Sequence, residues 1–289
     1  MLVFIVPLKS AKLSHDWALT SRLFERCVRA LCNQTSPNFR VVVVCNERPE
    51  CDYQHANLHY CEVDFPPPVD EPEDAGGYEL ARSKNIARKN ADKARKILTG
   101  LEFAARFAPT HTMVVDADDC VSNRLAQLVE QHPDSVGWYC KSGYFHNEGS
   151  RFLFLNRQNF NVVCGTSVIV SYAHRHLLFP TPDFYQHAFY DPPPGLVPLP
   201  FEGVVYLMAT GDNIYMSAQT RNEIYGSLFR RVFSKRIFAI AWKLLNYRPH
   251  LLTEARRREF GLYTLGERHP TAPLPTGSST GTPVPTPAA

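Results

Sequence analysis

The chain has 289 residues, and its 31 lysine and arginine side chains against 28 aspartate and glutamate give a net charge of +3. Hydrophobic residues make up 44% and charged residues 20%, a balance that excludes a disordered, collagenous or coiled-coil chain. The small positive surplus gives no basis for nucleic-acid binding, so we expect a globular protein without a nucleic-acid partner.

The opening MLVFIVPLK is typical of a buried strand, because its only base follows the apolar run, the reverse of a signal peptide. The sequence also contains no run of 18 apolar residues, so we expect a cytoplasmic protein. The eight cysteines include no CxxC spacing, which favours free buried thiols over disulfides or a structural zinc site.

The first third of the chain alternates strand and helix patterns. Apolar runs at 2–8 and 40–45 are typical of strands buried on both faces of a parallel sheet. The segment between them has helical spacing, with Ser14 as the expected N-cap, and so predicts a βαβ unit. A short strand at 57–65 then runs into a proline-rich, acidic loop at 66–77, which we expect on the active-site side.

A long cationic helix is predicted at 80–107, with Gly100 as a candidate break. The next strand, 110–115, ends in a tetrad of three carboxylates and one alanine at 116–119, and a helix at 122–131 follows directly. We call the four residues Asp116, Ala117, Asp118 and Asp119 the acidic tetrad.

The pattern changes after Val136 to short aromatic strands, which predict an antiparallel or mixed arrangement. An apolar strand at 202–210 leads to Gly211-Asp212-Asn213, and the spacing at 228–245 predicts an amphipathic helix. These changes divide the chain into a Rossmann-like half, a mixed half with the amphipathic helix, and a disordered Pro/Thr-rich tail. The predicted boundaries are 1–135, 136–268 and 269–289.

The acidic tetrad is the most informative feature of the sequence. Ligands of α/β sheets bind at the carboxyl ends of parallel strands, where the tetrad is expected to lie. Crowded carboxylates raise one another's pKa, so such a cluster usually has a cation to neutralise it, and oxygen ligands select Mg²⁺ or Mn²⁺.

An EF-hand is excluded because Val121 stands where that loop needs glycine. A solvated turn capping the next helix is the structural alternative, and a haloacid-dehalogenase-type phosphatase, which also places DxD after a strand, is a minor one.

Taken together, these segments resemble a GT-A-fold glycosyltransferase, and the inverting glycosyltransferase family two in particular. The resemblance implies an α/β fold in which a Rossmann-like nucleotide-diphospho-sugar transferase sheet carries helices on both faces. The matching parts are VFIVPLK at 3–9, RALCNQT at 29–35, VVVVCNE at 41–47, RSKNIARKN at 82–90, VVDADD at 114–119 and GDN at 211–213.

The resemblance also implies a nucleotide-diphosphate sugar donor and an acceptor of unknown kind. Asp116 would lie beside the ribose or nucleotide, while Asp118 and Asp119 would hold Mn²⁺ or Mg²⁺. Pro7 and Lys9 end the first strand where family members hold the nucleoside.

The sequence departs from the family at two places. Asn46 and Glu47 stand where the family carries two aspartates, one of which contacts the base. The usual Glu-Asp pair near the acceptor is missing, and Asp212 takes the comparable place. A carboxylate there is our candidate general base for inversion, with a helix N-cap as the structural alternative.

Four further basic residues are candidates for ligand contacts. Arg82 and Lys84 lie at the start of the cationic helix and are candidates for contacts to the diphosphate or nucleobase, or belong to its solvated face. His187 is a candidate third metal ligand or acceptor contact, or a structural histidine, and the same alternatives apply to His250.

The helix at 228–245, with the basic run 256–258, suits contact with an anionic membrane at the inner face. The alternative is packing on the enzyme itself or on a second subunit of a homodimer. A non-catalytic sugar-binding or scaffold module on a transferase fold is the remaining functional alternative.

Overall fold

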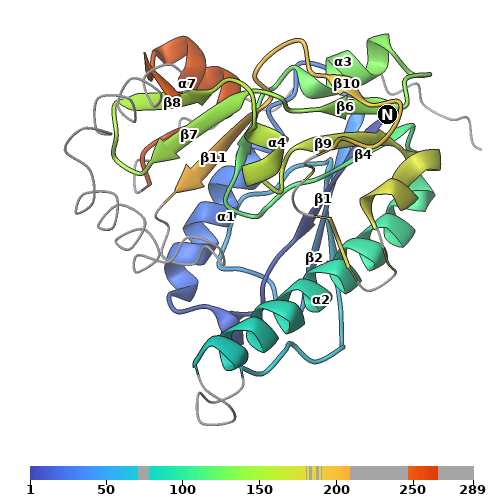
Figure 1. Ribbon diagram of the computed structural model, residues 1–289, viewed down its shortest axis with the longest axis vertical. Helices are drawn as coiled ribbons and strands as arrows, with labels where there is room; N and C mark the ends of the chain where they lie inside the picture. The colour runs from blue at the N-terminus through green and yellow to red at the C-terminus, as the bar shows by residue number, and fades with distance from the viewer. Residues whose placement is uncertain are drawn as a thin grey trace, which may run out of the picture.

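The computed structural model describes residues 1–70, 78–179, 181, 184–186, 189, 191–208 and 247–265, with the side chains of 78–82 and 247 excepted. Within these ranges the chain forms two mixed sheets flanked by helices (Figure 1). The expected α/β fold, with helices on both faces of the sheet and a mixed second half, is confirmed, and its GT-A type stays a prediction.

The larger sheet is built on parallel strands, as the continuous apolar runs predicted. Its strand β1 (Leu2–Pro7) is fully buried, because helices cover both of its faces. Among the described residues the order is β10-β6-β9-β4-β1-β2-β3, and only β9 runs antiparallel to its neighbours. The strands are β1 (Leu2–Pro7), β2 (Phe39–Cys45), β3 (Leu58–Glu62), β4 (His111–Val114), β6 (Gly137–Tyr139), β9 (Val168–Ser171) and β10 (Val197–Pro198).

Two helices enclose the central strands (Figure 1). Helix α1 (Trp17–Leu31) packs with one set of alternating β1 side chains and α2 (Tyr78–Ala104) with the other. The predicted N-cap of α1 at Ser14 is wrong: Asp16 caps the helix by accepting a hydrogen bond from the Leu19 N–H at 2.8 Å.

The predicted break at Gly100 is also wrong, because α2 continues through this residue to Ala104 and a 3-10 turn, η2 (Ala105–Phe107), extends it. A Cβ at Gly100 would lie 2.7 Å from Ile5 Cγ2 and 2.9 Å from Val44 Cγ2. The glycine therefore serves the close approach of the helix to β1 and β2.

The smaller sheet has the order β12-β8-β7-β11-β5 among the described residues, with β11 parallel to β7 and the other pairs antiparallel. Each sheet takes strands from both sides of residue 135, and the division at that residue stays a prediction. The strands are β5 (Cys120–Val121), β7 (Gly143–Asn147), β8 (Phe152–Asn156), β11 (Val204–Met208) and β12 (Tyr247–Leu251).

Short helical segments connect the strands. Helix α3 begins three residues later than predicted, after a stretch in which the Ser122 and Asn123 N–H groups donate to the Gly203 and Glu259 carbonyls. The remaining segments are α3 (Leu125–Gln131), α4 (Phe160–Val163), α7 (Glu254–Phe260), η1 (Ala11–Leu13) and η3 (Tyr172–Leu178).

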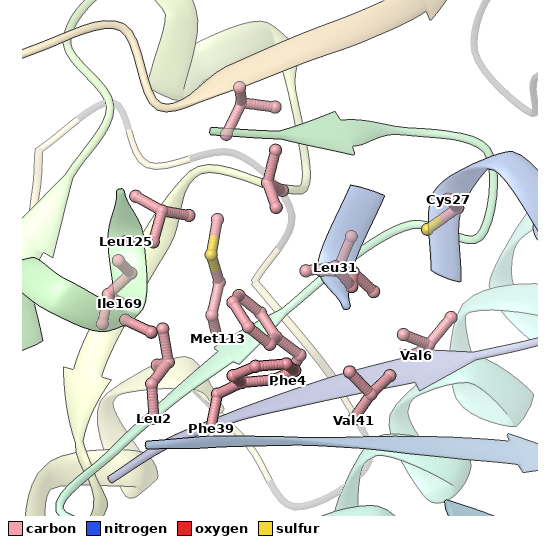
Figure 2. Close-up of a cluster of buried hydrophobic side chains, with 14 of the residues drawn as sticks. Leu2, Phe4, Val6, Cys27, Leu31, Phe39, Val41, Met113, Leu125 and Ile169 are labelled. Atoms are coloured by element: carbon pink, nitrogen blue, oxygen red, sulfur yellow. The ribbon is translucent and has the colours of Figure 1, made fainter. Parts of the chain in front are cut away.

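The main core lies between the larger sheet, α1 and α3 (Figure 2). Phe4 of β1 and Phe39 of β2 meet edge to face there, with ring centroids 6.4 Å apart, and Leu31 and Met113 lie beside them. All eight cysteines are free, as expected, and six of them are buried. No helix in the described ranges is long and apolar enough to cross a bilayer.

Candidate functional site

The acidic tetrad lies where the chain passes from the larger sheet to the smaller one. It follows β4 at the carboxyl ends of the parallel strands and precedes β5. The Asp119 N–H donates to the Asp116 carbonyl at 3.0 Å, which closes a tight turn, and the Asp116 N–H donates to Thr166 Oγ1 at 2.9 Å. The backbone thus holds three carboxylates at the rim of the sheet, as the sequence predicted.

Asp119 is the most enclosed of the three, with no exposed surface. Its Oδ1 accepts from the Leu207 N–H of β11 at 3.2 Å, and its Oδ2 accepts from the Cys164 thiol at 3.6 Å. Burial, then the charges of Asp118 and Asp116, raise the pKa of Asp119 well above its usual range, although hydrogen bonds from Thr166 and Leu207 oppose the rise. Asp119 therefore ties the tetrad to the smaller sheet.

Asp118 is half-buried, and its environment is less favourable to the anion than water. Burial and then the neighbouring Asp116 raise the pKa of Asp118 to about 6, while Lys9 and Lys93 act against the rise. An anion disfavoured in this way gains from a cation beside it, so Asp118 is the tetrad carboxylate best placed to take one.

Asp116 forms an ion pair with Lys93 of α2, and both side chains are mostly buried. The Lys93 ammonium also lies 5.6 Å from the centroid of the buried Tyr185 ring, within the range of a cation–π contact. Lys93 was not among the candidate cations predicted from the sequence, which lie at the start of this helix. The only sequence feature that could have indicated Lys93 is its place on the helix, three turns after Arg82. A helix of 27 residues has many positions that look equally suitable.

The end of β1 lies next to the tetrad, as the resemblance implied. Pro7 is the last residue of the strand, and Lys9 is half-buried and near enough to Asp118 to favour its anion. The neighbouring Lys96 is buried, where it donates to the Leu8 carbonyl at 3.0 Å and pairs with Asp92 at 3.0 Å. Lys96 therefore fastens α2 to the end of β1.

Asn46 and Glu47 follow β2 at the same rim. The Asn46 amide donates to the Phe65 carbonyl at 2.7 Å, and its buried Oδ1 has no hydrogen-bond partner among the described residues. Glu47 Oε1 accepts from the Ser10 hydroxyl at 2.7 Å and from the Ala11 N–H, which orders the turn after β1. Their base contact stays a prediction, for which Asn46 presents an open acceptor.

The remaining candidates do not join this cluster in the described part of the chain. Lys84 is exposed on α2, and His250 on β12 contacts Arg256 at 3.0 Å, in keeping with the structural alternative. Asp212, His187, the side chain of Arg82, the predicted helix at 228–245 and the predicted tail at 269–289 lie outside the described residues.

A divalent cation at the tetrad would take most of its ligands from water and substrate phosphates rather than from the protein. In the described ranges, no group of three or more histidine, cysteine, aspartate or glutamate side chains is arranged to hold a metal. Mg²⁺ in such sites keeps waters and binds one or two carboxylates plus substrate phosphates. Asp118 suits that pattern, with Asp116 beside it, whereas both oxygens of Asp119 accept hydrogen bonds from within the protein.

The described residues form a mixed α/β fold with an acidic loop at the carboxyl rim of its parallel strands. No protein-family model and no curated protein matches its sequence.

Similar solved structures include S. aureus TarS, at a TM-score of 0.37 and 13% identity over 89% of this chain and 68% of that one. TarS in complex with UDP-GlcNAc gives a TM-score of 0.37 and 14% identity over 89% and 69% of the two chains. TarS in complex with UDP gives 0.36 and 11% over 81% and 73%.

Proposed function

We propose that this chain is a glycosyltransferase that moves a sugar from a nucleotide-diphosphate sugar to an acceptor hydroxyl, with inversion and with Mn²⁺ or Mg²⁺ as cofactor. The observation that carries the proposal is the half-buried acidic tetrad at the rim of the parallel strands, faced by Lys9 and Lys93. The sequence segments that resemble the inverting glycosyltransferase family two support it.

The chemistry of sugar transfer requires positive charge where this rim has it. Negative charge builds on the leaving diphosphate as the bond to the anomeric carbon breaks, so cations beside the phosphates stabilise the transition state more than the ground state. Bound at Asp118, a divalent cation would supply Lewis acidity to the leaving phosphate. Among the described residues, Lys9 and Lys93 are near enough to assist it.

The other proposed roles combine positions at the rim with the resemblance to the family. Asp116 is the proposed ribose or nucleotide contact, and Asn46 offers a base the acceptor atom Oδ1. Pro7 shapes the nucleoside pocket through the backbone at the end of β1. Inversion also needs a base on the face opposite the leaving group, and Asp212 is the proposed residue. His187, Arg82 and Lys84 stay candidates for secondary contacts.

A thermal-shift screen of UDP-, GDP- and dTDP-sugars, with and without Mn²⁺, tests donor and metal together, because a ligand that binds only the folded protein raises its stability. We expect one nucleotide class to give a shift that grows with Mn²⁺. Asp118→Asn should remove the Mn²⁺-dependent part, while Asp134→Asn, an exposed aspartate near the amino ends of the strands, should leave it intact. The same screen with Asp119→Asn tests the predicted second ligand.

The absence of any nucleotide-dependent shift in the native protein would contradict the proposal. A shift without sugar transfer to any acceptor would favour the non-catalytic sugar-binding module. Hydrolysis of a simple phosphate ester without an acceptor would favour the phosphatase alternative, which a colorimetric assay measures. Asp212→Asn should keep the donor-induced shift and lose transfer, and loss of both or of neither would reject its role as base.

Peripheral membrane contact, or a homodimer through the helix predicted at 228–245, remains part of the proposal for the acceptor side. Of the basic residues in this proposal, 256–258 are described, and they lie on α7. Sedimentation with anionic vesicles and measurement of the oligomeric state separate the two.

A further inference from the structure

Lys93 is the basic residue of α2 that pairs with the acidic tetrad. Its side chain is only 14% exposed and pairs with Asp116, whose side chain is 24% exposed. Lys93 belongs to α2 and Asp116 to the loop after β4, so the ion pair links the helix to the carboxyl end of the sheet.

The charges around the tetrad are nearly balanced before any ligand binds. Three carboxylates are gathered there, and Lys93 and Lys9 are the lysines that act on Asp118. The third lysine near the end of β1, Lys96, is buried and already pairs with Asp92. Among the described residues, Lys93 is a cation of this rim that contacts the tetrad directly through Asp116 and still keeps part of its side chain exposed.

The two ligands of the proposed reaction act on Lys93 in opposite ways. A divalent cation at Asp118 places positive charge beside the ammonium, and like charges in a partly buried site repel strongly. A diphosphate brings negative charge, which attracts the same ammonium and accepts its hydrogen bonds. A metal ion alone must thus compete with Lys93 for the tetrad, whereas a metal ion with a diphosphate gives Lys93 a new partner.

Resting on the proposed function, we propose that Lys93 couples the two ligands: it pairs with Asp116 in the free protein and with the donor's diphosphate in the loaded one. Lys93 thereby weakens the binding of Mn²⁺ alone and strengthens the binding of a nucleoside diphosphate with Mn²⁺. The site then takes its cation together with the nucleotide, which protects the tetrad from occupation by metal alone.

The test compares two affinities in the native protein and in Lys93→Met. Electron paramagnetic resonance of free Mn²⁺ gives the metal affinity without nucleotide, and titration calorimetry with UDP, GDP and dTDP in Mn²⁺ gives the nucleotide affinity. We expect Lys93→Met to bind Mn²⁺ alone about 3- to 10-fold more tightly and the preferred nucleotide roughly tenfold more weakly. Opposite changes in the two affinities are the signature of coupling, since damage to the fold would weaken both.

Two variants serve as controls. Lys93→Arg keeps the positive charge and should keep the native order of affinities. Lys89→Met removes a lysine one turn earlier on α2, where it pairs with Asp70 at 3.0 Å, and should change neither affinity. Lys93→Gln gives a second neutral side chain, which answers the question if the methionine variant does not fold.

Equal weakening of both affinities in the neutral variants, or no change in either, would overturn the coupling while leaving the glycosyltransferase proposal intact. Failure of the native protein to bind any of the three nucleotides would reject both proposals, and the two failures are therefore distinguishable.

Discussion

Adjacent residues in the acidic tetrad face different surroundings although their side chains are chemically identical. Asp119 is enclosed and bonded to Leu207 and Cys164, and so joins the two sheets. Asp118 is half-buried, and no protein cage of metal ligands surrounds it in the described ranges. An ionised carboxylate in such a place costs stability in the free protein, which is typical of residues retained for binding.

The raised pKa of Asp118 predicts that Asp118→Asn stabilises the free protein at neutral pH. The folded-state pKa of about 6 lies above the ordinary 3.8, so the folded protein holds this proton more tightly than the unfolded chain does. The resulting cost is full above pH 6, shrinks as the pH falls from 6 to 4, and vanishes below. We expect the variant to gain on the order of 1–3 kcal/mol in unfolding free energy at pH 7.5.

Urea unfolding at a series of pH values, in the presence of a chelator, measures this difference. The advantage of the asparagine variant should decrease steadily between pH 6 and pH 4. A variant that is less stable than the native protein at pH 7.5 would show that Lys9 and Lys93 favour the anion more than burial opposes it.

The site could be predicted from the sequence only where its residues are neighbours in the chain. The tetrad stands out because three carboxylates directly follow an apolar strand, and Lys9 because it ends the first one. Lys93 was missed because its partner Asp116 lies 23 residues away, and a cationic helix presents several lysines of equal appearance. Pairing of that kind is decided by how the helix packs, which no local pattern records.

At the scale of elements, helix α2 shows that a glycine can either interrupt a helix or allow it to pack closely. Glycine weakens an isolated helix, which is why Gly100 was predicted as a break. Here it lies against Ile5 and Val44, and the contact lets α2 approach the sheet closely enough for Lys96 to reach the end of β1. The existence of the strands and long helices was predictable from periodicity, whereas the reason for this glycine depends on the packed neighbours.

Gly100→Ala should therefore destabilise the protein, although alanine favours helices by about 1 kcal/mol. The new methyl group would meet two branched side chains in a buried interface, and overpacking of this kind costs about 1–3 kcal/mol. We expect a net loss of roughly 1 kcal/mol or more in urea unfolding. Glu102→Ala, at an exposed position of the same helix, should be close to neutral, and equal stability of both variants would contradict the packing role.

At the scale of the whole molecule, residues far apart in the sequence hold the two sheets together. The smaller sheet was only partly predictable, because β5 has two residues and β11 pairs in parallel with β7 across 60 intervening positions, beyond any local pattern. One contact that unites distant parts is Arg26 of α1. It is 1% exposed, pairs with Glu148 in the β7–β8 turn at 2.8 Å, and donates to the Tyr263 carbonyl at 3.0 Å.

This contact predicts unequal effects from the removal of its two partners. Arg26 Nε and Nη2 are buried without hydrogen-bond partners among the described residues, so the guanidinium is already poorly solvated, whereas Glu148 is 33% exposed. Glu148→Gln leaves a buried charge with one carbonyl partner and should cost about 3 kcal/mol, as broken buried pairs do.

Arg26→Met, in contrast, removes that buried charge, fills much of the same volume and leaves Glu148 to be hydrated, so we expect a loss of no more than about 1 kcal/mol. Urea unfolding of both variants and of the double variant measures the asymmetry and the coupling between the two residues. A larger loss for Arg26→Met than for Glu148→Gln would mean that the arginine's packing between α1 and residue 263, rather than its charge, holds these distant segments together.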